Sequence, residues 1–236
     1  MPNVTCRLIL LAAGLLSATV TLVAQEPPRR TDTKGSPDRT TAGKTAAKKT
    51  PAKKQRLFDG KSLDGWTVVG QFDFARHGKV RVIGGAMELQ AGEPGTAVRW
   101  SGKFPRDNYE VTLQAMRVEG DDFFCGLTFP VGKEYCSLIL GGWGGMVVGL
   151  SNIDGQSAVE NETTQAEKFK PKTWYSIRLR VVPKAIEVWL DNESLIRVER
   201  KDREFSIWWE QEPVRPFGIA TWRTTGRFRN IELRRF

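Results

Sequence analysis

Histidine and cysteine are scarce in this chain: His77 is the single histidine, and three cysteines occur among 236 residues. No CxxC pair and no Cys/His spacing typical of a zinc site is present, so we expect neither a metal site nor a bound cofactor. His77 lies just before Gly78 in a short polar stretch, which favours a loop residue over a catalyst. The scarcity of these side chains argues against a metalloenzyme with histidine or cysteine ligands.

The first 25 residues have the layout of a secretory signal peptide, because an apolar run over residues 8–24 follows the lone basic residue Arg7. We therefore expect residues 1–25 to be removed and the mature protein to be periplasmic or secreted. The alternative is an uncleaved membrane anchor, since the run approaches the length that spans a bilayer.

Residues 26–56 hold ten lysines and arginines against Glu26, Asp32 and Asp38, with hardly an apolar side chain. Such a segment cannot bury enough surface to fold, so it is predicted to be a disordered basic linker. Residues 57–236 carry 25 basic and 24 acidic side chains, so the net charge of +9 does not indicate nucleic-acid binding by the domain. The linker could associate with an anionic cell envelope; a solvated spacer is the alternative.

The remaining residues, 57–236, are predicted to form a single all-β domain. Short runs rich in Val, Ile, Tyr and Phe recur between clusters of Gly, Pro, Asn and Asp, and residues 109–118 alternate between apolar and polar as a half-buried strand does. No segment of about eleven or more residues shows a helical period. This pattern predicts a two-sheet jelly-roll sandwich of lectin type.

Two cysteines, Cys125 and Cys136, lie in this domain. If Pro130 and Val131 occupy the centre of a turn, Cys125 falls opposite Cys136, and an exported protein could join them in a disulfide. A longer loop at Gly132-Lys133 would break this register and leave two buried thiols.

All eight tryptophans lie in the domain. Trp66, Trp174 and Trp189 sit inside apolar strand patterns and are assigned to the core. Trp143 differs because two glycines flank it on each side, so we expect its ring to be a platform on which a sugar stacks. The polar stretch that follows contains Asn152, Glu160, Asn161 and Glu162, and functional residues concentrate in such loops. An ordinary solvated loop is the alternative.

The domain opens with the sequence LFDGKSLDGW at residues 57–66 and closes with GIATW at residues 218–222 and FRNIEL at residues 228–233. These segments resemble the 3-keto-glycoside lyase/hydratase family, formerly called 3-keto-disaccharide hydrolases. The resemblance implies a concanavalin A-like sandwich of lectin/glucanase type over residues 57–236. It also implies that the protein acts on a carbohydrate that carries a 3-keto group.

Elimination at a 3-keto sugar requires a base and an acid. We draw these from the domain's loop carboxylates, and choose Asp121, Glu160 and Glu162. Arg223 would orient a sugar oxygen through its planar guanidinium, while Trp143 and Trp222 would stack on the ring, with Asn152 and Asn161 as further contacts. We expect Trp143, the polar loop and Trp222-Arg223 to converge on the concave sheet.

The chain departs from the resembled family at residues 220–226, which read ATWRTTG where many members have a run like Gln-Asp-His-Gly. The histidine and the carboxylate of that run are missing. Catalysis of 3-keto-glycoside cleavage is therefore one hypothesis, and a non-catalytic glycan-binding module on the same fold is the alternative. A structural envelope domain attached through the basic linker is a third.

Overall fold

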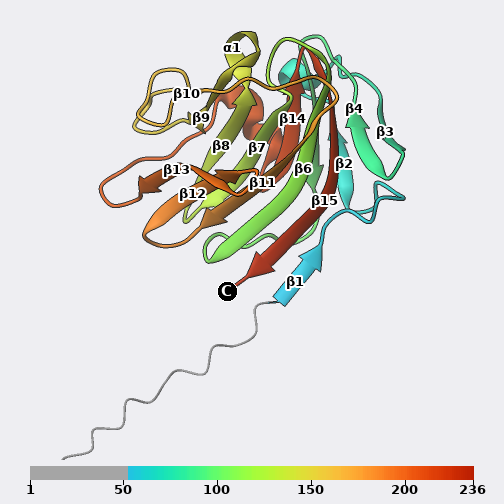
Figure 1. Cartoon of the computed structure of the whole chain (residues 1–236). Helices are drawn as coiled ribbons and strands as arrows, with labels where there is room; N and C mark the ends of the chain where they lie inside the picture. The colour runs from blue at the N-terminus through green and yellow to red at the C-terminus, as the bar shows by residue number, and fades with distance from the viewer. Residues whose placement is uncertain (1–52) are drawn as a thin grey trace, which may run out of the picture. The chain divides into compact units, whose positions relative to one another are not determined.

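The computed structural model describes residues 53–236, so the predicted signal peptide and most of the predicted linker lie outside the described residues. Within this part of the chain, no helix is long and apolar enough to cross a membrane. The described residues form two antiparallel sheets that pack face to face, which confirms the predicted sandwich (Figure 1).

One sheet has eight strands. Seven follow the order β13-β12-β11-β6-β15-β4-β3, and the eighth, β1, pairs with the C-terminal end of β15. The two longest strands, β6 and β15, have twelve residues each and pair with each other at the centre of the sheet. The bounds are β1 (Lys53–Arg56), β3 (Val80–Ile83), β4 (Ala86–Leu89), β6 (Tyr109–Gly120), β11 (Trp174–Val181), β12 (Ala185–Leu190), β13 (Glu193–Glu199) and β15 (Thr224–Arg235).

The other sheet has seven strands in the order β10-β9-β8-β7-β14-β5-β2. Three short helices complete the elements: η1 and η2 are 3-10 helices, and α1 is a single turn that joins β8 to β9 at one end of the sandwich (Figure 1). The bounds are β2 (Trp66–Val69), η1 (Phe72–Phe74), β5 (Gly95–Trp100), β7 (Cys125–Val131), β8 (Glu134–Gly141), α1 (Gly142–Gly145), β9 (Val147–Ser151), β10 (Gln165–Ala166), η2 (Trp209–Val214) and β14 (Gly218–Trp222).

Strand β1 corrects the predicted boundary between linker and domain. Residues 53–56 pair with Glu232–Arg235 of β15, and Lys54 forms an ion pair with Glu232 at 2.5 Å. Residues 53–56, which the sequence analysis placed in the linker, therefore belong to the sheet. The sequence of these residues is basic and lacks apolar side chains, so it carried no signal for a strand.

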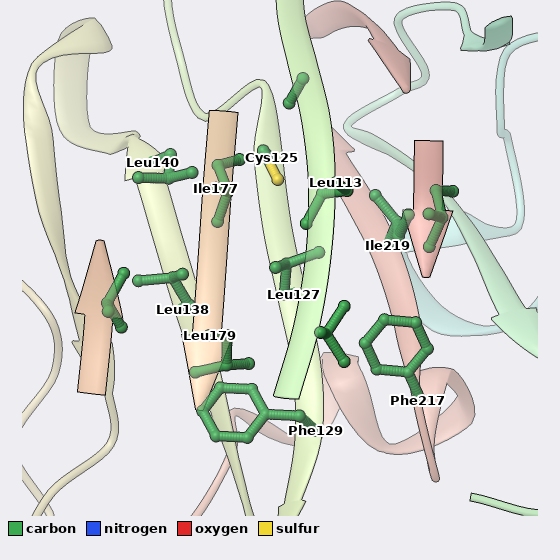
Figure 2. Close-up of a cluster of buried hydrophobic side chains, with 14 of the residues drawn as sticks. Leu113, Cys125, Leu127, Phe129, Leu138, Leu140, Ile177, Leu179, Phe217 and Ile219 are labelled. Atoms are coloured by element: carbon green, nitrogen blue, oxygen red, sulfur yellow. The ribbon is translucent and has the colours of Figure 1, made fainter. Parts of the chain in front are cut away.

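The core lies between the inner faces of the two sheets. Alternate residues of each strand point inward, as the two-residue period of a strand requires. Figure 2 shows Leu127 and Leu138 of the seven-stranded sheet facing Leu113 and Leu179 of the eight-stranded sheet. Each fully buried side chain of this size contributes about 1.5–3 kcal/mol relative to an exposed one.

The predicted disulfide is wrong. The turn between β7 and β8 is centred on Gly132-Lys133, so Cys125 pairs with Leu140 and Cys136 pairs with Phe129. The two cysteines are offset by four residues along the hairpin, which is about 13 Å at the rise of a strand, whereas a disulfide needs Cα atoms about 4.4–6.8 Å apart. Both are free, buried thiols, and burial raises the pKa of each.

Of the three tryptophans assigned to the core, only Trp66 lies there. Trp174 and Trp189 lie half-buried on the outer face of the eight-stranded sheet, because Ile177 and Leu179 take the inward positions of β11. An arginine covers each ring: the centre of the Arg229 guanidinium is 4.1 Å from the centroid of Trp174, and that of Arg178 is 3.6 Å from the centroid of Trp189. Cation–π contact therefore replaces the expected packing.

Candidate functional site

A cavity of about 290 Å³ lies on the outer face of the seven-stranded sheet. Its floor consists of Ser137 and Ile139 of β8 and Ser151 of β9, which point away from the core because their neighbours Leu138 and Leu150 point into it. The walls come from α1, from the segment before β7, from the end of β14 and from η2. They consist of Asp122, Phe123, Trp143, Trp208, Glu210, Gln211 and Trp222.

Helix η2 crosses the outer face of this sheet and forms one wall. The Trp208 indole N–H donates to Ser151 Oγ at 3.2 Å, and Thr128 Oγ1 donates to Gln211 Oε1 at 3.3 Å. At the other end of η2, the side chain of Val214 closely approaches Gly218. These contacts join η2 and the residue before it to β9, β7 and β14, and they hold the helix in place as a wall of the cavity.

Trp143 stands on α1 at the tip of the β8–β9 hairpin, and 46% of its surface is exposed. Arg117 holds this tip in place, because its Nη2 donates to the carbonyl oxygen of Gly145 at 2.7 Å and to that of Gly141 at 3.4 Å. Both glycines have positive φ; a Cβ on Gly141 would collide with the guanidinium, and a Cβ on Gly145 would press against it. The glycines thus allow the turn that presents the Trp143 ring.

Phe123 and Trp222 form the aromatic wall beside the end of β14. Their rings are stacked, with centroids 5.9 Å apart and an angle of 27° between the planes. The Trp222 backbone N–H donates to the carbonyl oxygen of Phe123 at 3.0 Å, which ties the two segments together. Trp143, Trp208 and Trp222 therefore surround one cavity, and aromatic rings of this kind can stack on the apolar face of a sugar.

Asp122 is the first of two carboxyl groups at the cavity. Partial burial raises the pKa of its side chain, and the backbone N–H groups of Phe123 and Trp143 and the charge of Arg223 offset part of that rise. The Phe123 N–H donates to Asp122 Oδ1 at 2.7 Å. A buried carboxyl group of this kind keeps its proton to a higher pH than an exposed one.

Glu210 supplies the second carboxyl group from η2. Its Oε2 atom is shielded from solvent, and it has no hydrogen-bond partner among residues 53–236. A buried oxygen without a partner is costly, and in native proteins it calls for an explanation. Glu210 itself lines the cavity, so a bound ligand would lie next to this side chain.

The structure brings only part of the predicted site together. Trp143 and Trp222 both line the cavity, whereas the three carboxylates proposed from sequence do not. Glu160 accepts a hydrogen bond from Ser157 Oγ at 2.9 Å, Glu162 forms an ion pair with Arg203, and Asp121 is exposed. The carboxylates of the polar loop are therefore engaged by other protein groups outside the cavity.

The predicted polar contacts also lie outside the cavity. The Asn161 amide organises its own loop and donates to the carbonyl oxygens of Leu150 and Ser157 at 2.7 and 2.8 Å. Asn152 is buried and accepts a hydrogen bond from Ser151 Oγ at 2.7 Å. Arg223 is exposed and acts on the site through the pKa of Asp122. His77 is exposed, as expected of a loop residue.

Sequence reasoning missed the contribution of Trp208 and Glu210 and chose Asp121 over its neighbour Asp122. One signal was present: Trp208 and Trp209 are adjacent, and neighbouring side chains of an extended segment point in opposite directions. At least one of the two rings was therefore expected to lie outside the core. Within residues 53–236, no group of three or more His, Cys, Asp or Glu side chains could hold a metal ion.

Comparison with known proteins identifies relatives of this fold. The family model of the 3-keto-alpha-glucoside-1,2-lyase-like domain matches residues 53–234. No curated protein sequence gives a significant match.

Among solved structures, a protein of unknown function with a galectin-like fold from Bacillus subtilis has a TM-score of 0.54 at 10% identity, over 78% of this chain and 98% of the other. The Crh5 transglycosylase in complex with NAG has a TM-score of 0.51 at 11% identity, over 79% of this chain and 83% of the other. At these identities the similarities show the fold alone.

Proposed function

Because the chain belongs to the family of 3-keto-alpha-glucoside-1,2-lyase-like domains, we propose that it binds an oxidised sugar in the cavity of the seven-stranded sheet and cleaves 3-keto-glycosides. One observation carries this proposal: two carboxyl groups, of Asp122 and Glu210, lie in the walls of a cavity lined by three tryptophans. Stacking surfaces would hold the ring, and the carboxyl groups would move the protons that the reaction requires.

The reaction proceeds by elimination and then hydration. The ketone at C3 makes the proton on C2 acidic, and a base removes that proton. The electron pair of the C2–H bond forms the C1=C2 double bond as the C1–O bond breaks, and an acid protonates the departing oxygen. Water then adds its hydroxyl to C1 and a proton to C2, so the net result is hydrolysis of the glycoside.

We assign the acid to Asp122 and the base to Glu210. The raised pKa of Asp122 favours the protonated form that a general acid needs. Glu210 supplies the base because it is the other carboxyl side chain that lines the cavity. These two residues would replace the histidine and carboxylate of the family run that residues 220–226 lack.

The size of the cavity favours one sugar ring over an oligosaccharide. Its volume of about 290 Å³ lies at the lower end of the range of about 300–1,000 Å³ for small-molecule sites. We further propose that the substrate is met outside the cytoplasm, because residues 1–25 have the pattern of a signal peptide. The basic residues before the domain would keep the protein near an anionic envelope.

A non-catalytic glycan-binding module is the second candidate. The aromatic walls of the cavity favour it, since binding a sugar requires stacking surfaces and hydrogen bonds but no catalytic acid or base. In that case oxidised and ordinary glycosides would bind with similar affinity, and neither would be cleaved.

The experiment that tests the proposal incubates the mature protein with a 3-keto-glucoside and with the corresponding ordinary glucoside. We expect release of the aglycone from the 3-keto-glucoside only. Asp122→Asn and Glu210→Gln should each lower kcat by about 10²–10⁴-fold and still bind the substrate. Glu162→Gln is the matched control, because its carboxylate pairs with Arg203 outside the cavity and its loss should leave kcat unchanged. Binding of both glucosides without turnover would instead establish the module.

A further inference from the structure

Two large aromatic side chains beside the cavity are exposed without forming its wall. Phe72 of η1 is 53% exposed and Trp209 of η2 is 57% exposed. Their rings pack edge to face, with centroids 5.1 Å apart and an angle of 70° between the planes. We call this pair the aromatic shelf. Exposed apolar surface of this kind, next to a ligand cavity, is characteristic of a binding surface.

The shelf is continuous with the cavity along both of its elements. Trp209 lies between Trp208 and Glu210, which both line the cavity. On the other element, the buried Phe74 belongs to a small apolar cluster on the outer face of the sheet, against which Phe123 of the cavity wall packs. The shelf therefore adjoins the η2 wall of the cavity, on the side where η1 and η2 contact β5.

The backbone at Phe72 adds a second observation. Its φ is 54°, a left-handed conformation that a bulky residue rarely adopts. Such a conformation is costly and persists where the surrounding structure enforces it, often at ligand sites. In η1 the Phe74 side chain is fully buried, while the Phe72 ring is exposed and packs against Trp209.

We propose that the aromatic shelf binds the aglycone of the glycoside and that this aglycone contains an aromatic ring. This inference rests on the proposed function, which places one sugar ring in the cavity and leaves its substituent to extend beyond the rim. The two shelf side chains offer hydrocarbon faces and a single N–H donor between them. A second sugar would require partners for several hydroxyl groups, whereas an aryl group requires only the stacking surface that the rings supply.

The test measures binding to the Asp122→Asn protein, in which turnover is suppressed. Calorimetry compares phenyl and methyl 3-keto-glucosides of the same anomeric configuration. We expect the phenyl compound to bind about ten-fold more tightly, in line with one aromatic contact and its buried area. Phe72→Ala and Trp209→Ala should each remove most of this preference and leave the affinity for the methyl compound unchanged, and Trp209→Phe should retain part of it.

Phe236→Ala is the matched control, because Phe236 is equally exposed at 51% but follows β15 in the other sheet. It should leave both affinities unchanged. Equal binding of phenyl and methyl compounds by the parent protein would overturn the proposal. A 3-keto-disaccharide that gains the same advantage from the shelf would show that the aglycone is a sugar. A change in oligomeric state of the shelf variants, seen by light scattering, would show an interface between copies of the chain.

Turnover by the unsubstituted protein separates this proposal from the proposed function. If 3-keto-glucosides are cleaved but phenyl and methyl compounds bind alike, the reaction stands and the shelf proposal fails. If no glycoside is cleaved but the phenyl preference depends on Phe72 and Trp209, the shelf stands as a binding surface and the reaction fails. The melting temperature of each shelf variant should match the parent, because both side chains are exposed.

Discussion

Asp122 owes its proposed chemistry to the partial burial of its carboxyl group. The side chain of Asp121, the preceding residue, is exposed to solvent, whereas that of Asp122 is partly buried and lines the cavity. Burial is the largest cause of the raised pKa of Asp122, and the charge of Asp121 adds to it. Two adjacent aspartates therefore differ in pKa, and in the role that we propose for them, because only Asp122 is partly buried.

This difference predicts the pH dependence of the reaction. A general acid works only while it is protonated, so kcat/KM should fall as the pH rises through the raised pKa of Asp122. Asp122→Asn should lose this alkaline limb as well as most of its activity, because an amide has no proton to release in this range. A pH profile of kcat/KM for both proteins measures the effect. An unchanged alkaline limb in the variant would assign the acid to another group.

The same shift has a consequence for stability, with a definite sign. Since folding raises the pKa of Asp122, the native state binds its proton more tightly than the unfolded state does. The contribution of Asp122 to stability is therefore greatest below the ordinary aspartate pKa and declines as the pH rises through the raised value. Denaturant titrations across this window should show Asp122→Asn gaining stability relative to the parent as the pH rises.

At the scale of elements, the hairpin formed by β8, α1 and β9 presents Trp143 to the cavity. The ring is exposed, and the hairpin is held by Arg117 and by the pairing of β8 with β9 rather than by Trp143 itself. The stability of the hairpin and the function of its ring are therefore separate properties.

Trp143→Ala should accordingly weaken sugar binding by about 1–3 kcal/mol, which is the loss of a stacking partner and its buried area. The melting temperature should change little. Calorimetry with the Asp122→Asn background measures the affinity. Trp189→Ala is the control, because Trp189 is stacked under Arg178 on the outer face of the other sheet; unchanged affinity in Trp143→Ala would remove the hairpin from the site.

The alternation of apolar and polar residues within single strands could be predicted from the sequence, whereas the contacts between distant segments could not. The apolar residues of 109–118 fall at alternate positions and predict β6 well, because that period depends on one strand alone. The β7–β8 turn could be centred on Pro130-Val131 or on Gly132-Lys133, and cross-strand packing decided for the second. Glu210 reaches the cavity only because η2 crosses the sheet, a placement that depends on anchors in β9, β7 and β14.

At the scale of the whole molecule, one face of the seven-stranded sheet forms the core and the other carries the proposed binding cavity. Its inner face packs against the eight-stranded sheet and forms the core, as Figure 2 shows for Leu127 and Leu138. Its outer face forms the floor of the cavity and carries η1 and η2. Successive side chains of a strand point to opposite faces. Leu138 of β8 therefore packs in the core, and its neighbour Ile139 lines the proposed site.

Leu138 and Ile139 test this separation directly. Leu138→Ala should lower the free energy of unfolding by about 2–5 kcal/mol, since the side chain is fully buried between the sheets, and it should leave the affinity of the folded protein for sugar unchanged. Ile139→Val removes one methylene from the cavity floor, so it should cost only about 0.5–1.5 kcal/mol of stability but change the affinity. Denaturant titration and calorimetry measure the two quantities on the same samples. If Leu138→Ala altered the affinity as strongly as Ile139→Val, the faces of the sheet would be coupled and the cavity could not be treated as a site built on a rigid floor.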